Sequence, residues 1–343
     1  MLYRLVRPFL FSLEPERAHR LTMRVLELAH RTKSVRLLSG GPSMPAPRNV
    51  MGLSFPNPVG LAAGLDKNGE HVDALAALGF GFIEIGTVTP RPQPGNPRPR
   101  MFRLVSDRAI INRMGFNNEG VDRLLSNVAS ARYRGILGIN IGKNFDTPLE
   151  RAVEDYLYCL GKAYTAASYI TINISSPNTA NLRELQHEDQ LDGLLQALST
   201  ERRRLAQLYG RRVPLAVKIA PDLAQPDIER MASLFIKHEI DAVIATNTTV
   251  SREGLTGARN ANQQGGLSGA PLKPRSTKIV AQLAAVLAGR VPIIAAGGIF
   301  SAADAREKIE AGASLVQLYS GLVYQGPSLV RTIASALADG DSN

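Results

Sequence analysis

Residues 170–179 (ITINISSPNT) begin with alternating isoleucines and end with a group of polar side chains. Because successive side chains of a strand point to opposite faces, the three isoleucines share one face and Asn173 lies on the other. Pro177 stops strand pairing, which leaves the Ser176 hydroxyl and the Asn178 amide at the carboxyl end of the strand. Ligands of parallel α/β folds bind at that end. The stretch alone leaves two interpretations open, a binding site and a solvated edge strand.

A lysine, Lys218, stands inside another apolar run, residues 215–219. A buried lysine needs an anionic partner or a lowered pKa. Three interpretations are open. Lys218 forms a structural ion pair with Glu84, or it forms a Schiff base with a carbonyl substrate as in an aldolase, or its ammonium group holds negative charge on a reduced cofactor ring.

Both stretches belong to a series of eight short apolar runs, each followed by a helical pattern. Eight strand–helix alternations predict a (β/α)8 barrel. A doubly wound sheet is the alternative, but the G-x-G-x-x-G motif typical of its first turn is absent. The expected strands are residues 59–62, 82–88, 136–141, 169–174, 215–219, 242–246, 293–296 and 315–319. The expected helices are residues 69–78, 119–132, 149–167, 188–208, 225–238, 271–288, 302–310 and 327–338.

Polar residues or glycines follow all eight runs, which turn formation alone does not explain. Gly297-Gly298 and Tyr319-Ser320-Gly321 follow the seventh and eighth runs, where barrels commonly bind phosphate through backbone N–H groups. Alternation also places five polar side chains inside the barrel, where an unpaired group costs about 1–3 kcal/mol. Together these features indicate a phosphorylated, ring-bearing ligand, FMN. The five inward side chains are Glu84, Asn140, Asn173, Lys218 and Gln317.

The composition of the 343-residue chain narrows the functional classes. A hydrophobic content of 44% is enough for a large core, and the single cysteine, Cys159, excludes an intrachain disulfide and favours a reducing compartment. The five histidines lack metal-ligand spacing, so we expect no metal site. Because aromatic residues make up only 6% and no recognition motif occurs, anionic small ligands and a membrane surface explain the charge of +10 better than nucleic acid does.

Residues 1–40 predict a separate unit of two amphipathic helices, at residues 2–11 and 15–36, ahead of a barrel domain at residues 41–343. The unit carries eight Lys or Arg residues against three Glu residues. A basic amphipathic helical pair is typical of a segment that lies on a membrane. A helical cap packed on the main domain is equally compatible with the pattern.

Five segments carry a resemblance to dihydroorotate dehydrogenase, and they occur in the same order as in that family. They are residues 62–68 (AAGLDKN), 111–117 (INRMGFN), 173–179 (NISSPNT), 246–249 (TNTT) and 265–269 (GGLSG). The resemblance extends from about Pro15 to the carboxyl end. Two features resemble the membrane-associated, quinone-using class 2 enzymes: the basic helical extension, and Ser176 where the class 1 enzymes have a cysteine.

The resemblance implies oxidation of (S)-dihydroorotate to orotate in pyrimidine biosynthesis, with proton removal from C5 by Ser176 and hydride transfer from C6 to N5 of FMN. It implies FMN contacts at Ala63, Gly64, Lys67, Thr87, Asn140, Asn173, Lys218, Thr246, Gly269, Gly298, Tyr319 and Ser320. The implied substrate contacts are Lys67, Asn112, Arg113, Met114, Gly115, Phe116, Asn173, Asn178, Asn247 and Thr248. A quinone tunnel between the N-terminal helices would be lined by His19, Arg103 and Tyr319.

The resemblance further implies one non-covalently bound FMN per chain, a membrane quinone as electron acceptor, and a monomer bound peripherally to the cytoplasmic face of the inner membrane. The polar segment 179–186 is long enough to form a lid over the site, although an ordinary connector fits as well. Two alternatives remain open: a Schiff-base aldolase that uses Lys218, and a membrane-bound module that binds a flavin or nucleotide without catalysis.

Overall fold

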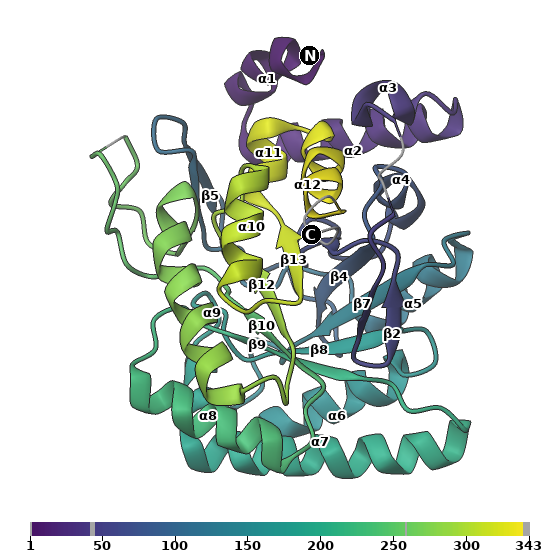
Figure 1. The fold of residues 1–343 in the computed structure, drawn as a ribbon, viewed down its shortest axis with the longest axis vertical. Coiled ribbons are helices and arrows are strands. Elements are labelled where there is room, and N and C mark those ends of the chain that lie inside the picture. Colours follow the sequence, from purple (N-terminus) through teal and green to yellow (C-terminus); the bar gives the residue numbers. More distant parts are fainter. Residues whose placement is uncertain (1, 42–44, 258, 339–343) are drawn as a thin grey trace.

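The computed structural model describes residues 2–41, 45–257 and 259–338. Eight parallel strands close into a barrel in chain order (Figure 1), so the predicted (β/α)8 barrel is confirmed. Each strand lies within one residue of its expected position, because continuous apolar runs mark buried parallel strands clearly. The strands are β3 (Val59–Leu61), β4 (Phe82–Val88), β7 (Ile136–Ile141), β8 (Tyr169–Asn173), β9 (Leu215–Ile219), β10 (Ala242–Ala245), β12 (Ile293–Ala296) and β13 (Leu315–Leu318).

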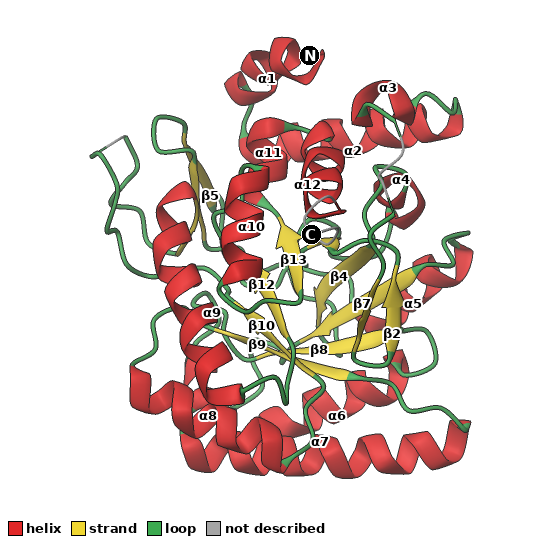
Figure 2. Cartoon of the chain, viewed as in Figure 1, coloured by secondary structure: helices red, strands yellow, loops and turns green. Residues whose placement is uncertain are grey.

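Helices follow the strands and surround the barrel (Figure 2). The eight expected helices are all present, but several are shorter than expected, and 3-10 turns take the place of the first residues expected for α6 and α9. They are α4 (Val72–Ala76), α5 (Val121–Ser130), α6 (Ala152–Ala163), α7 (Glu188–Tyr209), α8 (Gln225–Lys237), α9 (Lys273–Leu287), α10 (Ala302–Glu310) and α12 (Ser328–Ala338). The 3-10 turns are η1 (Leu149–Arg151), η2 (Leu182–Gln186) and η3 (Ala270–Leu272).

A hairpin that the sequence did not reveal, β1 (Arg48–Val50) and β2 (Leu53–Phe55), covers the amino ends of the barrel strands. Phe55 is fully buried and packs edge-on against Phe82, with 5.1 Å between ring centroids. These rings belong to a separate apolar cluster inside the barrel. Apolar packing therefore fills this end, and polar groups gather toward the carboxyl ends.

A second small sheet and a short helix stand at the carboxyl ends of the barrel. Strands β5 (Met101–Leu104), β6 (Ala109–Asn112) and β11 (Gly266–Gly269) form an antiparallel sheet in the order β11-β6-β5. Helix α11 (Ser320–Gln325) follows β13 directly. Neither was predicted. The sheet brings two distant segments, residues 109–112 and 266–269, to the same side of the barrel.

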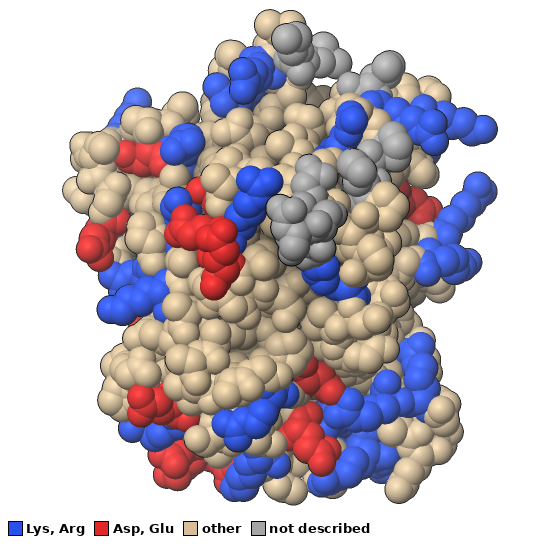
Figure 3. Space-filling model, in the orientation of Figure 1, with Lys and Arg blue, Asp and Glu red and all other residues tan. Residues whose placement is uncertain are grey.

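The N-terminal segment folds as α1 (Leu2–Ser12), α2 (Pro15–Arg31) and α3 (Val35–Ser39). The expected helix 15–36 is therefore wrong at its end, because Lys33 adopts a φ of +58° and separates α2 from α3. Helix α2 packs beside α4 and β5. Large apolar side chains are exposed on the first two helices, including Leu5, Phe9 and Leu28. Basic side chains accompany them at the top of the molecule (Figure 3).

No helix within the described ranges is long and apolar enough to cross a membrane.

Candidate active site

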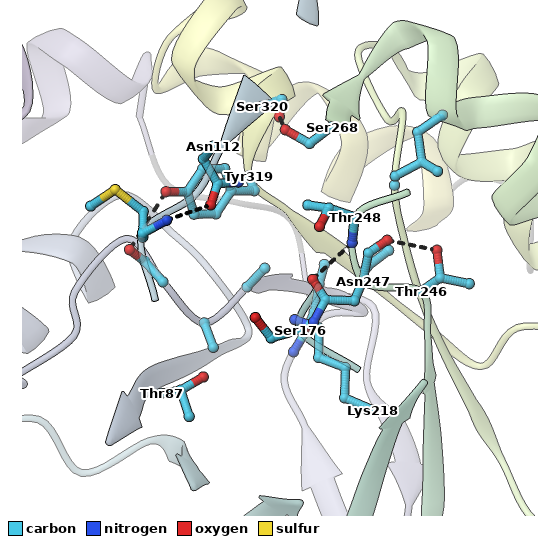
Figure 4. A pocket seen from close by; sticks show the side chains of 18 of the residues that line it. Thr87, Asn112, Ser176, Lys218, Thr246, Asn247, Thr248, Ser268, Tyr319 and Ser320 are labelled. Atoms are coloured by element: carbon cyan, nitrogen blue, oxygen red, sulfur yellow. Dashed lines mark hydrogen bonds between the residues drawn. The ribbon is translucent and has the colours of Figure 1, made fainter. Parts of the chain in front are cut away.

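A cavity of about 1050 Å³ opens at the carboxyl ends of the barrel strands. Residues of seven of the eight strands or of the loops that follow them, and residues of the small sheet, line it (Figure 4). It collects Ser176 and nearly all of the cofactor and substrate residues predicted from the sequence. These are Ala63, Gly64, Lys67, Thr87, Asn112, Met114, Gly115, Phe116, Asn173, Asn178, Lys218, Thr246, Asn247, Thr248, Gly269, Gly298, Tyr319 and Ser320.

Lys218 is a buried lysine that contacts no anion among the described residues. Its side chain is 6% exposed, and burial lowers its pKa, although the negative charge of Glu84 opposes that shift. No ion pair joins Lys218 to Glu84 or to any other residue that the structure describes. Instead, Glu84 accepts hydrogen bonds from Asn140, Tyr169 and Gln317 at 2.7–2.9 Å. The ion-pair interpretation therefore does not explain why a lysine stands here.

Asn140 lies behind the cavity wall and fixes two residues that line it. The Thr87 hydroxyl donates to Asn140 Oδ1 at 2.5 Å, and Asn173 Nδ2 donates to the Thr87 hydroxyl at 2.9 Å and to Asn140 Oδ1 at 3.2 Å. Asn140 Nδ2 itself donates to Glu84 at 2.8 Å. The buried glutamate thus orients the amides and the hydroxyl that face the cavity.

The Ser176 hydroxyl lies among amide side chains, and Lys218, Asn247 and Thr248 lie in the same part of the cavity (Figure 4). Ser176 is 6% exposed, and its Oγ accepts a hydrogen bond from the backbone N–H of Asn178 at 3.2 Å. Asn178 Nδ2 donates to Asn112 Oδ1 at 3.2 Å. No histidine or carboxylate is among the residues that line the cavity, within the described part of the chain.

Lys67 lies between the cavity and the N-terminal helices. Its ammonium donates to the Gly64 carbonyl at 2.8 Å. Burial is the main cause that lowers its pKa to about 8, and the nearby Arg100 cation adds to the shift. The lysine is therefore available to bind an anion near neutral pH, when it is protonated.

Glycine and serine residues line the cavity beside η3 and α11. Ser268 and Ser320 share a hydrogen bond of 2.8 Å, and Figure 4 shows this pair apart from Lys218 and Ser176. Gly298 adopts a φ of +74°, and a Cβ there would lie 2.6 Å from the backbone nitrogen of Lys273. Only glycine allows this loop to pass so close to the first residue of α9. Ser268 and Gln317 also line the cavity; the GGLSG segment contained Ser268 without marking it as a site residue.

A second cavity of about 1800 Å³ connects this site to α2 and contains the predicted quinone residue His19. Gly64, Lys67, Met114 and Tyr319 line both cavities. Burial lowers the pKa of His19 to about 4, so its imidazole is neutral at pH 7. Burial also raises the pKa of Tyr319 to about 12.

Two predicted residues lie elsewhere. Arg103 donates to the carbonyls of Leu10 and Leu13 and lies over the Phe11 ring, so it fixes α1 rather than lining the second cavity. Arg113 turns away from the cavity: its guanidinium donates to the Pro99 carbonyl at 2.9 Å and lies over Phe102. Arg113 therefore belongs to a loop of the site, but its side chain packs against Pro99 and Phe102 outside the cavity.

The model of the dihydroorotate dehydrogenase family matches residues 46–340. The chain belongs to this family. It is 62% identical to the dihydroorotate dehydrogenase (quinone) of Azoarcus sp. (strain BH72) over 99% of both chains. It is 61% identical to that of Nitrosospira multiformis, over 99% of this chain and 97% of the relative. The resemblance found in the sequence is confirmed, and with it the class: an oxidoreductase and flavoprotein of pyrimidine biosynthesis.

Solved structures agree with this assignment. The structure of DHODH from Eimeria tenella in complex with ferulenol superposes with a TM-score of 0.86 at 37% identity, over 97% of this chain and 93% of that chain. The ligand-free structure from the same organism gives a TM-score of 0.82 at 38% identity.

The residues present fit a flavin mononucleotide. Lys218 lacks a contacting anion, and Gln317 Oε1 and Thr248 Oγ1 are buried atoms without hydrogen-bond partners among the described residues. A ring with carbonyl and N–H groups would satisfy such atoms. The glycine and serine residues beside η3 and α11 offer backbone N–H and hydroxyl donors suited to a phosphate.

Proposed function

We propose that this chain oxidises (S)-dihydroorotate to orotate, and that it uses one non-covalently bound FMN and a membrane quinone. The observation that carries the proposal is that Ser176, the amide side chains and Lys218 converge on one cavity, and that Lys218 contacts no anion among the described residues. A pyrimidine with carbonyl and N–H groups is best bound by amides, which both donate and accept hydrogen bonds.

Cofactor binding is divided between two groups of residues. Gly269, Gly298, Ser320 and the loop around them would hold the phosphate. Lys218 would hold the ring, and its charge would stabilise the ring when it becomes anionic. When bound, FMN accepts a hydride and then passes its electrons on, one or two at a time. Ala63, Gly64, Thr87, Asn140, Asn173, Thr246 and Tyr319 complete the proposed binding site, with Asn140 acting through Thr87 and Asn173.

Substrate binding would use Lys67 for the carboxylate and amides for the ring, with Ser176 removing the C5 proton. Asn112, Asn173, Asn178 and Asn247 supply the amides, and Met114, Gly115, Phe116 and Thr248 complete the wall. A serine hydroxyl is intrinsically a weak base. Thr179 Oγ1, buried and without a partner among the described residues, is a candidate to receive the proton from Ser176.

The second half-reaction would take place through the cavity beside α2. Residues 1–40 would give access to the membrane and the quinone, and residues 41–343 would form the FMN-binding barrel. Exposed apolar and basic side chains on α1 and α2 support peripheral attachment to an anionic surface. The proposed surface is the cytoplasmic face of the inner membrane. His19 and Tyr319 line this path, and the chain would act as a monomer.

The purified full-length protein tests this proposal. It should be yellow, and anaerobic addition of dihydroorotate should bleach the flavin absorbance, which a soluble quinone should restore. A yellow protein that does not bleach would support a binding module without catalysis. A colourless protein that borohydride traps with a carbonyl substrate would support the aldolase alternative.

A further inference from the structure

Arg183 lies on the segment that follows Ser176, at the start of η2. Its guanidinium makes three hydrogen bonds to three different parts of the site. Nε donates to the Ser175 carbonyl at 3.2 Å, one terminal nitrogen donates to the Thr248 carbonyl at 2.8 Å, and the other donates to Asp222 Oδ2 at 2.8 Å. The two carbonyls belong to the residue before the proposed base and to a residue that lines the cavity.

Asp222 stands in the loop after β9 and is the anion in this arrangement. Besides Arg183, it accepts hydrogen bonds from the Thr249 hydroxyl and from the Val250 backbone N–H at 3.1 Å. Arg275 approaches its other oxygen at 3.6 Å. The carboxylate is 16% exposed, so solvent weakens the pair less than it weakens a surface pair. Asp222 thus joins the loops that follow β9 and β10.

The segment around Arg183 is packed onto the barrel rather than projecting into solvent. Leu182 and Leu185 are buried, and the Ala220 backbone N–H donates to the Gln186 side chain at 3.0 Å. Arg183 is the residue of this segment that reaches both the β8 loop and the β10 loop through hydrogen bonds.

We propose that Arg183 and Asp222 form a latch that fastens the loops after β8, β9 and β10 to one another and thereby positions Ser176 and Thr248 for reaction. This inference rests on the proposed function. A guanidinium has five N–H donors in a planar fork, so one side chain can bind two carbonyls and a carboxylate at fixed angles. Lysine offers a single point of charge and cannot reproduce that geometry.

Removal of the Arg183 side chain would break all three hydrogen bonds at once. The Ser175 and Thr248 carbonyls then lose their donor together. The loops that carry Ser176 and Thr248 would then lose their common anchor, and a small misplacement of the reacting groups slows a reaction strongly. Arg183 acts through Ser176 and Thr248 and is a positioning residue.

The test uses full-length flavoprotein with Arg183→Ala and Arg183→Lys. Stopped-flow bleaching under anaerobic conditions gives the rate of flavin reduction and its dependence on dihydroorotate concentration. We expect Arg183→Ala to keep its flavin, to reduce it about 100-fold more slowly at saturating substrate, and to show a raised KM. Guanidinium ions at millimolar concentration should restore part of the rate, which loss of general stability would not allow. Arg183→Lys should keep the ion pair with Asp222 but should retain only a minor part of the parental rate of flavin reduction.

Chymotrypsin cleavage within segment 179–186 provides a second measurement. Orotate should protect the parental protein, and Asp222→Asn and Arg183→Ala should both be cleaved faster and be protected less. Arg204→Ala, which removes an exposed arginine paired with Glu201 on α7, is the matched control and should behave as the parent. The latch would be overturned if Arg183→Ala were reduced and cleaved at the parental rates. It would also be overturned if Arg183→Ala lost its rate and guanidinium did not restore any of it. In either case, bleaching of the parental flavin by dihydroorotate would still support the proposed function. A parental protein that is not bleached would overturn both.

Discussion

No histidine or carboxylate of the described residues lines the cavity with Ser176, so its hydroxyl must act through position rather than through intrinsic basicity. We expect Ser176→Ala to bind FMN normally and to lose flavin reduction by about 10²–10⁴-fold at pH 7, the usual contribution of a general base. Single-turnover bleaching with dihydroorotate measures this step. Ser176→Cys should retain part of the rate, increasingly so as pH rises and the thiolate forms.

Ser233 on α8 provides the control for that substitution, because its exposed hydroxyl bonds only within its own helix, to the Glu229 carbonyl. Ser233→Ala should reduce flavin at the parental rate. A Ser176→Ala protein with near-parental rates would remove Ser176 from the role of base.

Because Lys67 is proposed to bind the substrate carboxylate, we expect substrate affinity to fall as the pH rises above the pKa of Lys67. Its pKa in the free protein is about 8, lowered mainly by burial, so the ammonium is charged below pH 8 and neutral above it. Because the charged form binds the carboxylate, we expect orotate affinity to be flat from pH 6 to 7.5 and to fall about tenfold per unit above pH 8.5. Titration of the flavin absorbance with orotate measures it.

A buried lysine outside the cavity, Lys143, controls for general effects of pH, since its ammonium donates to the carbonyls of Asn144 and Thr147. Lys143→Met should keep the decline above pH 8. Lys67→Met should bind orotate weakly at every pH and show no inflection. An inflection that survives in Lys67→Met would assign the titration to another group.

Motif residues and their geometry were predictable from the sequence to different extents. Ser176, Lys218 and the amides follow strand ends, and strand ends of a barrel meet by construction, so their convergence could be foreseen. Arg183 could not be found this way, because two of its acceptors are backbone carbonyls and its carboxylate is 39 residues away. Arg113 illustrates the converse: a residue within a site motif whose side chain turns outward.

At the scale of elements, local patterns identified the strands and helices of the barrel but not the additions to it. Strands β5, β6 and β11 are four residues long, and β11 pairs with β6 more than 150 positions away, so no local pattern marks the sheet. The break between α2 and α3 depends on one residue with positive φ, Lys33, which is not a residue type that usually signals one. Long-range pairing and single backbone conformations therefore account for most of what was missed.

Helices α1 and α2 are predicted to attach the protein to a membrane surface. Leu5 is 78% exposed and Phe9 is 59% exposed on α1, which lies at the top of the view in Figure 1. We expect Leu5→Glu with Phe9→Glu to lower the fraction bound to anionic vesicles by more than tenfold, because each side chain contributes about 1.5–3 kcal/mol when buried in lipid. Flotation with vesicles measures binding.

The same double variant should reduce its flavin with dihydroorotate at the parental rate, since neither residue lines the cavity. Leu208 is 62% exposed on α7, and this helix lies at the end of the molecule opposite α1 (Figure 1). Leu208→Glu is therefore the control and should bind vesicles as the parent does. Equal loss in Leu208→Glu would show that binding follows net charge rather than these helices.

At the scale of the whole molecule, the barrel is apolar near its amino ends and polar toward its carboxyl ends. Glycines make room for the rings of the apolar part: a Cβ at Gly60 would lie 2.2 Å from the ring of Phe82, and a Cβ at Gly138 would lie 2.3 Å from that of Tyr169. The Tyr169 hydroxyl then donates to Glu84 at 2.9 Å, where the polar layer begins. The apolar packing at the amino ends thus offsets the free-energy cost of burying Glu84 and Lys218 nearer the carboxyl ends.

Phe55 of the β1–β2 hairpin completes the apolar half. Its replacement should lower the stability of the protein but leave the rate of flavin reduction nearly unchanged. The ring is fully buried against Phe82, so Phe55→Ala should lower the free energy of unfolding by about 3–5 kcal/mol, the usual cost of deleting a buried phenylalanine. Urea denaturation of the flavoprotein measures this loss. Because the hairpin lies at the end of the barrel remote from Ser176 and Lys218, flavin reduction at 20 °C should stay within about twofold of the parent. A large loss of rate in a folded Phe55→Ala protein would show that packing at the amino ends reaches the site, and that the two halves of the barrel are not independent.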